Sequence, residues 1–377
     1  MDTGSAPLAP YAVEYRSGER VIHGSGSPAF TISAANQSRL RRFLKSDAYS
    51  AGRAFIRGEL DVSGDLIAAL RLKKSYPPSG LLHVLWTAAA RFSPARLETW
   101  LQSRNRAARN IRFHYDVSNE FYRQFLDERM VYSEAYFRDP NWSLEKAQEE
   151  KLDKICRDLE LHSGERFLDV GCGWGALLLR AVEGYGAQAT GCTLSRQQYQ
   201  FVVSLLEERG LQNRVRVRET DYRNISERFD KIASIGMFEH VGRHRLCQYF
   251  RSVYGLLESG GRFVNSGIIR PESSSDDPET RFLLKRVFPG GELAHLTDVI
   301  REAEGAGFAI LRVESMRLHY GRTCREWVNR LREKADRCIQ LVGAEVYRTW
   351  LLYLAASAVS FESGETDVFA ILMTKPP

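Results

Sequence analysis

Residues 166–183 are the part of this sequence that most constrains the fold. They read RFLDVGCGWGALLLRAVE, which is an apolar run, a glycine-rich turn and an amphipathic helical pattern, with Asp169 just before the first glycine. Gly171, Gly173 and Gly175 let the backbone turn tightly, and the following helix points its amino end at a bound molecule. The unit predicts a nucleotide-type cofactor site, although a dinucleotide site or a purely structural turn also fits GxGxG.

Two more strand ends follow along the chain. An apolar run over 187–194 precedes Ser195, which can cap a helix over 196–209, and a third run over 215–220 ends at Asp221. Parallel strands that alternate with helices bring such ends together at one crevice. We therefore expect an α/β fold with a doubly wound, mostly parallel sheet.

The polar groups at these strand ends favour S-adenosylmethionine over a nicotinamide dinucleotide. Ala176 follows GCGWG where a pyrophosphate fingerprint has another glycine, and the second strand ends in Thr193 instead of an acidic residue. Thr193 or Gln198 is expected to supply polar contacts instead. We expect Asp221 to accept from the adenine amino group, with Tyr222 beside it. The fold expected is therefore class I methyltransferase-like, with a smaller α+β domain in front.

The basic residues are concentrated at the front of the chain. Residues 1–110 carry 16 Arg and Lys against 8 Asp and Glu, whereas all 377 residues together have a net charge of +6. We expect 1–105 to form a small basic module that addresses an anionic phospholipid surface or a second subunit, followed by a methyltransferase domain over 106–377. The amphipathic pattern around 97–101 supports membrane contact, but core packing and a solvated basic face explain these features equally well. No nucleic-acid-binding motif accompanies the charge.

The compartment is predicted from what the sequence lacks. It has no apolar run of about 18 residues and no signal-peptide pattern at its start. The six cysteines show neither paired metal-ligand spacing nor disulfide density, so no metal is expected. We expect a cytoplasmic protein that meets the membrane at its inner face.

Several ordered motifs make the sequence resemble the cyclopropane fatty acid synthases. They are the aromatic segment 111–137, LDVGCGWGALL, DYR at Asp221, GMFEHVG at 236–242, FPGG at 288–291 and YLAASAVSF near the carboxyl end. The resemblance implies that S-adenosylmethionine methylates the cis double bond of an unsaturated acyl chain held in a phospholipid. It also implies an insertion over the acyl pocket near 270–296 and a homodimer formed through the front module.

The resemblance assigns a catalytic site but also reveals departures from it. The family base is taken to be a bicarbonate ion held by a cysteine segment, a Glu, a His and a Tyr, of which Glu239 and Tyr320 are matched here. The family's YSCAY is YSEAY, so Glu134 stands in place of the cysteine. Ser266 replaces the histidine, and Ser357 replaces a cysteine of the last helix.

Glu134 is the departure with the largest chemical consequence. Two like charges about 4 Å apart repel by several kcal/mol at low effective dielectric, so bicarbonate beside Glu134 and Glu239 is disfavoured. We expect Glu134 to act as a built-in base in place of bicarbonate. A displaced base favours a methylene- or methyl-branched product over a cyclopropane, and a separate reductase would saturate a methylene group. The alternative is that Glu134 faces solvent and the alkene chemistry is lost.

The remaining site residues and two other functions complete these expectations. Two histidines are candidate site residues. His240 could act as a base but also suits the start of a helix, and His114 could contact the cofactor but also suits helix packing. A Glu-His pair near a methyl donor equally suits a small-molecule N- or C-methyltransferase of the coclaurine N-methyltransferase type. A third interpretation is a non-catalytic lipid-binding protein. The predicted cofactor residues are Tyr132, Ser133, Asp169, Gly171, Gly173, Gly175, Thr193, Leu194, Gln198, Asp221 and Tyr222, with Tyr132 and Ser133 over the methionine part.

Overall fold

The computed structural model describes most of the chain. The described residues are 9–38, 40–41, 46, 48–75, 118–271 and 293–377. Four sequence expectations lie outside them: the amphipathic pattern around 97–101, the domain boundary near 105, His114, and most of the insertion near 270–296, including FPGG.

The larger of the two β-sheets formed by the described residues is mostly parallel, as predicted. Its strand order is β10-β11-β9-β8-β5-β6-β7. Strands β5 to β9 pair in parallel, whereas β11 is antiparallel to both of its neighbours, β9 and β10. The strands are β5 Arg166–Val170, β6 Gln188–Thr193, β7 Val215–Glu219, β8 Phe229–Ile235, β9 Leu257–Ile269, β10 Ala309–Ser315 and β11 Asp367–Thr374.

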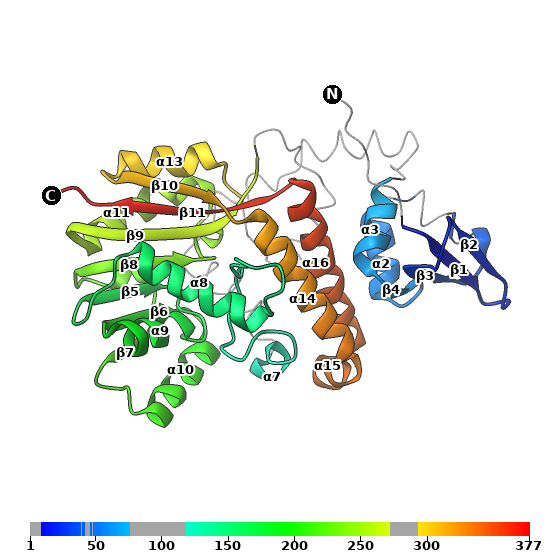
Figure 1. Ribbon diagram of the computed structural model, residues 1–377, viewed down its shortest axis with the longest axis horizontal. Coiled ribbons are helices and arrows are strands. Elements are labelled where there is room, and N and C mark those ends of the chain that lie inside the picture. The colour runs from blue at the N-terminus through cyan, green and yellow to red at the C-terminus, as the bar shows by residue number, and fades with distance from the viewer. Residues whose placement is uncertain (1–8, 39, 42–45, 47, 76–117, 272–292) are drawn as a thin grey trace.

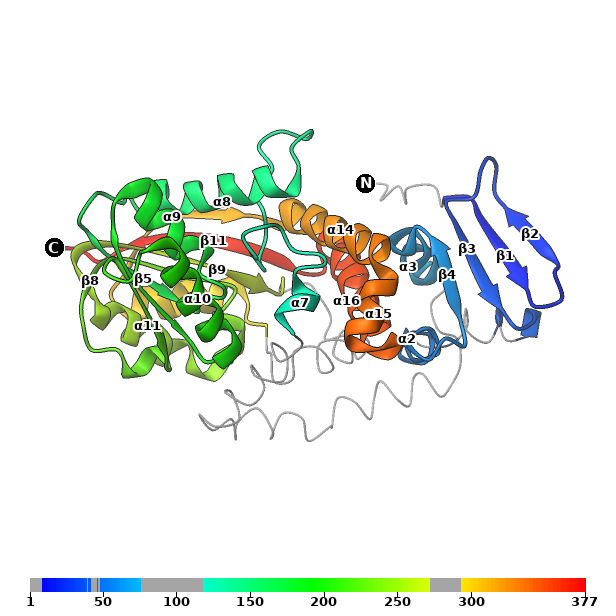
Figure 2. The same ribbon diagram turned by 90° about the horizontal axis from the view of Figure 1, so that it is seen from below.

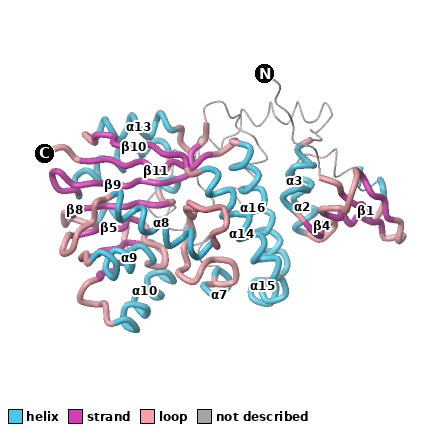
Figure 3. The backbone as a smooth tube through the Cα atoms, in the orientation of Figure 1, coloured by secondary structure: helices cyan, strands magenta, loops and turns pink. Residues whose placement is uncertain are grey.

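Helices cover both faces of this sheet, which makes it a doubly wound α/β fold (Figure 3). One buried cluster joins the sheet to α8 Leu144–Asp158, α9 Ala176–Tyr185 and α10 Arg196–Arg209. A second cluster joins the other face to α11 Leu246–Leu256 and α13 Leu296–Gly305. Local signals fix these helices: Ser143 and Ser195 accept hydrogen bonds as N-caps of α8 and α10. The predicted helix after the second strand is thus present with its predicted cap.

A helical layer stands beside the sheet, and an aromatic core fills it. It consists of α7 Asn119–Tyr122, α14 Arg317–Glu333, α15 Ala335–Val342 and α16 Ala344–Ser363. Tyr122 packs edge-on against Trp350 with ring centroids 5.4 Å apart and meets Trp174 of the glycine turn at 4.8 Å. Aromatic rings in such tilted pairs contribute stability beyond the area that they bury, so this core attaches the helical layer to the glycine turn.

The front of the chain forms a smaller α+β unit on the far side of that layer (Figure 1, Figure 2). Its four strands lie in the order β2-β1-β3-β4. The elements are β1 Tyr11–Tyr15, β2 Arg20–His23, β3 Phe30–Ala34, β4 Asp61–Gly64, α2 Ala48–Ile56 and α3 Leu66–Lys74. Helices α2 and α3 pack against α16, and residues of both join its buried cluster. The unit is therefore anchored through α16.

Among the described helices, none combines the length and the apolar character that crossing a bilayer requires.

Candidate active site

The glycine turn between β5 and α9 forms the floor of a pocket. Gly171 and Gly173 have φ angles of +82° and +53°, which favour glycine. A Cβ at Gly171 would lie 2.9 Å from Met237, whereas a Cβ at Gly173 would meet nothing within 4 Å. The space beside Gly173 is thus open to a ligand. Gly175 lies outside the pocket lining, and its missing Cβ gives room to Val202 instead, 3.1 Å away.

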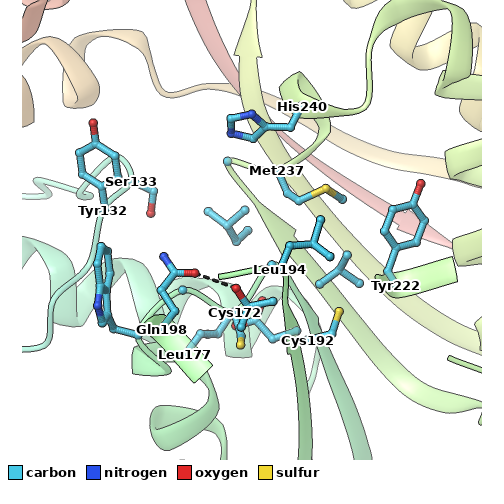
Figure 4. A pocket seen from close by; sticks show the side chains of 18 of the residues that line it. Tyr132, Ser133, Cys172, Leu177, Cys192, Leu194, Gln198, Tyr222, Met237 and His240 are labelled. Atoms are coloured by element: carbon cyan, nitrogen blue, oxygen red, sulfur yellow. Dashed lines mark hydrogen bonds between the residues drawn. The ribbon is translucent and has the colours of Figure 1, made fainter. Parts of the chain in front are cut away.

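The pocket collects most of the predicted cofactor residues at the carboxyl ends of β5, β6 and β7. In Figure 4, Tyr132 and Ser133 lie on one side of it and Tyr222 lies on the opposite side, with Gln198 between them. His240 projects from above. The predicted residues in its wall are Tyr132, Ser133, Asp169, Gly171, Gly173, Thr193, Leu194, Gln198, Asp221, Tyr222 and His240.

The end of β6 is held by a buried polar network. Thr193 Oγ1 donates to Gln198 Oε1 at 2.8 Å and accepts from the backbone N–H of Ser195 at 3.1 Å. The Ser195 hydroxyl in turn accepts from the N–H of Gln198 as the cap of α10. Buried polar groups that satisfy each other in this way hold a fixed geometry. This network therefore fixes the Gln198 side chain, including its amide nitrogen, at the pocket wall.

Asp221 has a partner that the sequence did not predict. Its carboxylate caps the 3-10 helix η1 (Tyr222–Asn224) and accepts from the Arg223 guanidinium at 2.8 and 2.5 Å. Each carboxylate oxygen can accept more than one hydrogen bond, so capacity remains for an amino group. Burial raises the pKa of Tyr222 to about 12, so this phenol stays protonated.

The lining suits a ligand with an adenosine part and a charged amino-acid part. Asp169 is 3% exposed at the end of β5, and burial raises its pKa to about 7 while the charge of Lys151 opposes that rise. Ser133, Gln198 and Asp221 offer further hydrogen-bonding groups around the same space. S-adenosylmethionine has matching groups at both ends, so the residues present fit the predicted cofactor.

Next to this pocket, β9 brings two buried carboxylates together. Glu134, 3% exposed, follows the pocket residues Tyr132 and Ser133, and its Oε1 accepts from the hydroxyl of Ser266 at 2.5 Å. Glu239, 8% exposed, lies in the 3-10 helix η2 (Phe238–His240), and its Oε1 accepts from the N–H of Ile268 at 2.5 Å. Residues two apart on a strand are separated by roughly 7 Å, so both carboxylates are held by one short stretch of β9.

The two carboxylates influence each other electrostatically. Burial is the main cause that raises the pKa of Glu239 to about 7, and the charge of Glu134 raises it further. The Oε2 atom of Glu239 has no hydrogen-bond partner among the described residues. A buried acid with a free oxygen beside a second carboxylate is suited to share or take up a proton.

Tyr320 and His240 complete the predicted catalytic set. Tyr320 is half-buried on α14 and stacks on Phe361 with centroids 4.6 Å apart. Burial raises its pKa, and the charges of Glu134 and Glu239 contribute, so the phenol remains a donor near both acids. Burial lowers the pKa of His240 to about 4, so it is neutral at the pocket wall.

Sequence reasoning missed several lining residues, above all Lys151. It lies on α8, is 4% exposed and donates from Nζ to the Ser133 hydroxyl at 2.8 Å. One signal was available, because Lys151 and Gln148 fall at helical spacing within the apolar face of Leu144, Leu152 and Ile155. The other missed lining residues that contribute polar or sulfur-containing side chains include Met130, Met237, Arg245 and Gln248.

Comparisons with known proteins agree with the family resemblance over most of the chain. Residues 102–371 match the family described as mycolic acid cyclopropane synthetase. A probable fatty acid methyltransferase of Pseudomonas putida is 36% identical over 356 residues, which span 93% of this chain and 88% of that protein.

Two solved structures are also similar. The mycolic acid cyclopropane synthase CmaA1, solved in complex with SAH and CTAB, is 33% identical with a TM-score of 0.68 and covers 71% of this chain and 98% of its own. Coclaurine N-methyltransferase, solved with N-methylheliamine and SAH, is 20% identical with a TM-score of 0.65 and covers 89% of this chain and 98% of its own. The second likeness concerns the fold alone.

Proposed function

The chain belongs to the mycolic acid cyclopropane synthetase family, as an S-adenosylmethionine-dependent methyltransferase that acts on lipids, and we propose that it methylates the cis double bond of a phospholipid-bound unsaturated acyl chain with Glu134 as the base. In this proposal no bicarbonate ion takes part. The product is a methylene- or methyl-branched chain in preference to a cyclopropane.

The chemistry defines what the protein must supply. Bound S-adenosylmethionine supplies an electrophilic methyl group. One alkene carbon forms a bond to that methyl group as the bond from the methyl group to sulfur breaks, and the neighbouring carbon becomes electron-poor. Loss of a proton from the new methyl group with ring closure gives a cyclopropane, and loss of a proton from the methylated carbon gives a methyl-branched alkene. A methylene group requires that a hydride first shifts from the methylated carbon to the electron-poor carbon, after which the methyl group loses the proton. Because an isolated alkene is a weak nucleophile, the protein must align the reactants and place negative charge near the developing cation.

One observation carries the assignment of Glu134 as the base. Its carboxylate is buried beside the cofactor pocket and is held by the Ser266 hydroxyl. These are the two positions where the family resemblance implies a cysteine and a histidine. A buried carboxylate with a fixed orientation can accept a proton from a cation beside it. This burial argues against a Glu134 that merely faces solvent.

Glu239 supports the same assignment as the second member of a coupled pair. With its pKa raised to about 7, Glu239 holds a proton for part of the time at neutral pH. The pair then carries fewer than two negative charges, which lowers the free-energy cost of burying both carboxyl groups. Glu134 and Glu239 have different partners on β9, so each keeps its own place.

The decisive experiment compares Glu134→Gln with the parent protein on vesicles of cis-monounsaturated anionic phospholipid, in bicarbonate-free buffer. We expect the parent to add one carbon to the acyl chain without bicarbonate, as seen by mass spectrometry. E134Q should lose at least about a hundredfold in rate, the usual contribution of a general base. Calorimetry should find unchanged S-adenosylmethionine binding in E134Q. Fragmentation of the product separates a ring from a branch.

A matched control is Glu149→Gln, which removes a half-exposed carboxylate on α8 that pairs with Arg129. It should keep the parent rate. An E134Q protein with normal turnover, or a parent that needs bicarbonate, would contradict the assignment of the base.

A second candidate function rests on His240. This neutral imidazole lines the pocket directly after Glu239, and the unprotonated nitrogen of a neutral imidazole can accept a hydrogen bond from an amine. A small-molecule N- or C-methyltransferase of the coclaurine type would use such a pair. Cofactor binding without any modified lipid, together with methylation of a small amine, would favour this function.

The wider setting of the reaction belongs to the same proposal. The basic front of the chain suits contact with an anionic membrane surface at the inner face of the membrane, and it offers a surface for a homodimer. A methylene product would require a separate reductase. The vesicle assay tests the first point, because binding to anionic vesicles should weaken as salt is raised.

A further inference from the structure

The segment that carries Glu134 is attached to α8 by two polar side chains. Gln148 Nε2 donates to the carbonyl oxygen of Ser133 at 2.9 Å, and Lys151 Nζ donates to its hydroxyl at 2.8 Å. Gln148 and Lys151 are one helical turn apart on the buried face of α8. Thr323 of α14 holds the other side, accepting from the N–H of Ala135 at 3.0 Å. The residues before and after Glu134 are thus both fixed.

Lys151 is also a buried cation that three buried acids influence electrostatically. Burial lowers its pKa from the ordinary value, whereas the charges of Glu134, Asp127 and Asp169 raise it, in that order of effect. These acids come from three parts of the chain: Glu134 from the segment attached to α8, Asp127 from the turn after α7, and Asp169 from the end of β5. Lys151 therefore interacts electrostatically with the predicted base and also lines the cofactor pocket.

We propose that Lys151 is a positioning residue: its buried amino group holds the Tyr132–Glu134 segment against the cofactor pocket through the Ser133 hydroxyl and offsets the negative charge of Glu134. The inference rests on the proposed role of Glu134 as the base. A carboxylate that is removed from water without a nearby cation tends to take up a proton, and a protonated Glu134 cannot accept one from the substrate.

Other charged and titratable groups face the same region and must be counted. The charge of Glu134 contributes to the raised pKa of Glu239 of η2, because the two like charges repel. Tyr320 of α14 lies within the field of both acids and stays protonated. Asp169 and Asp127 compete for the charge of Lys151. Lys151 thus offsets a local excess of negative charge, and its loss should be felt first at Glu134.

The first test is the pH dependence of kcat in Lys151→Gln, Lys151→Met and Lys151→Arg. Gln keeps a donor for Ser133 without the charge, Met keeps bulk alone, and Arg keeps the charge. We expect K151Q to move the acid limb of kcat upward by about one pH unit, with the rate below the limb about tenfold lower. K151R should return the limb toward its original position. A purely structural role would lower kcat without moving the limb.

The matched control is Lys146→Met on the same helix. Lys146 is exposed and pairs with Glu149, away from the pocket. It should leave both the rate and the pH profile unchanged. A parent-like profile in K151Q, or a shift of equal size in K146M, would overturn the proposal.

The second test needs neither cofactor nor turnover. Thermal unfolding of the parent, K151Q, E134Q and the double variant at neutral pH forms a double-mutant cycle. Since E134Q removes the charge that Lys151 offsets, K151Q should destabilise the E134Q background less than it destabilises the parent. Additive shifts would overturn the inference.

The two tests separate the inference from the proposed function. If the unfolding shifts of K151Q and E134Q are coupled but E134Q is active, then Glu134 is not the base, and the electrostatic interaction between Lys151 and Glu134 still holds. An inactive E134Q with additive unfolding shifts and an unmoved K151Q profile would refute the role of Lys151 alone.

Discussion

Glu239 is a buried carboxyl group whose protonation links stability to pH. Its pKa in the folded protein is raised to about 7 from an ordinary value of 4.5. The folded state therefore binds more protons than the unfolded state between these two values. Stability is highest below the unfolded pKa and falls as pH rises through about 7, by roughly 3 kcal/mol for such a shift.

Replacement of Glu239 by Gln should remove this dependence. Gln keeps the acceptor for the N–H of Ile268 and is neutral at every pH. The free energy of unfolding of E239Q minus that of the parent should therefore increase between pH 5 and pH 8, by up to about 3 kcal/mol. Urea unfolding at several pH values measures this change, with E149Q as the half-exposed control. A difference that stays constant across this range would show that Glu239 is ionised throughout.

The strand β9 and the 3-10 helix η2 lie close together because one residue of β9 has no side chain. A Cβ at Gly267 would lie 2.3 Å from the Phe238 ring and 2.8 Å from Glu239 Oε1. Contacts this short force neighbouring groups to move, and η2 with Glu239 is packed directly against the site. The close approach of β9 and η2 thus requires glycine at position 267.

Gly267→Ala should therefore destabilise the protein by about 1–3 kcal/mol and reduce turnover strongly, because it displaces Glu239. Gly255→Ala is a suitable control: Gly255 lies inside α11, and its added Cβ would meet nothing within 4 Å. Alanine is the better helix former there, so G255A should gain about 0.5–1 kcal/mol. Thermal unfolding and the vesicle assay report both effects. If G267A matched the parent in both measurements, β9 and η2 would not need this contact.

The elements around the glycine turn could be predicted because their signals are local. An apolar run, a turn of glycines and a capping serine fix β5, α9 and the start of α10 within a few residues of each other. The link from Ser266 to Glu134 spans 132 positions of the chain. Motif resemblance named both residues, but nothing local placed one beside the other.

Lys151 shows the opposite limit. The run KAQEEKLDK is rich in charges and is typical of a solvated helix, so Lys151 was not predicted as part of the site. Its partner, the Ser133 hydroxyl, is 18 positions away and belongs to an irregular segment. Its place on the apolar face of α8 is a weak signal beside these charges, and the packing of α8 against that segment is what buries it.

At the scale of the whole molecule, α16 joins the two sheet-containing parts. Phe55 and Ile56 of α2 and Leu66 and Ile67 of α3 belong to the same buried cluster as the aromatic core of the helical layer. Ion pairs surround this contact: Arg71 of α3 and Arg325 of α14 both reach Glu362 near the end of α16. Buried apolar side chains and partly exposed ion pairs both connect the front unit to α16. The question is which of them contributes more to the free energy of unfolding.

Two substitutions one turn apart on α3 should separate these contributions. Ile67→Ala empties a site that is 3% exposed, and we expect it to lower the free energy of unfolding by about 3 kcal/mol. Arg71→Ala removes an ion pair whose arginine side chain is 50% exposed, which should lower it by less than about 1 kcal/mol. Urea unfolding gives both values, and limited proteolysis should cut the front unit faster in I67A alone. A larger loss in R71A would mean that charge holds the unit, and raised salt should then loosen it in the parent as well. If I67A loses more stability than R71A, the front unit and the methyltransferase sheet share one continuous core. A change in either part then alters the packing of α14 and α16, next to Tyr320.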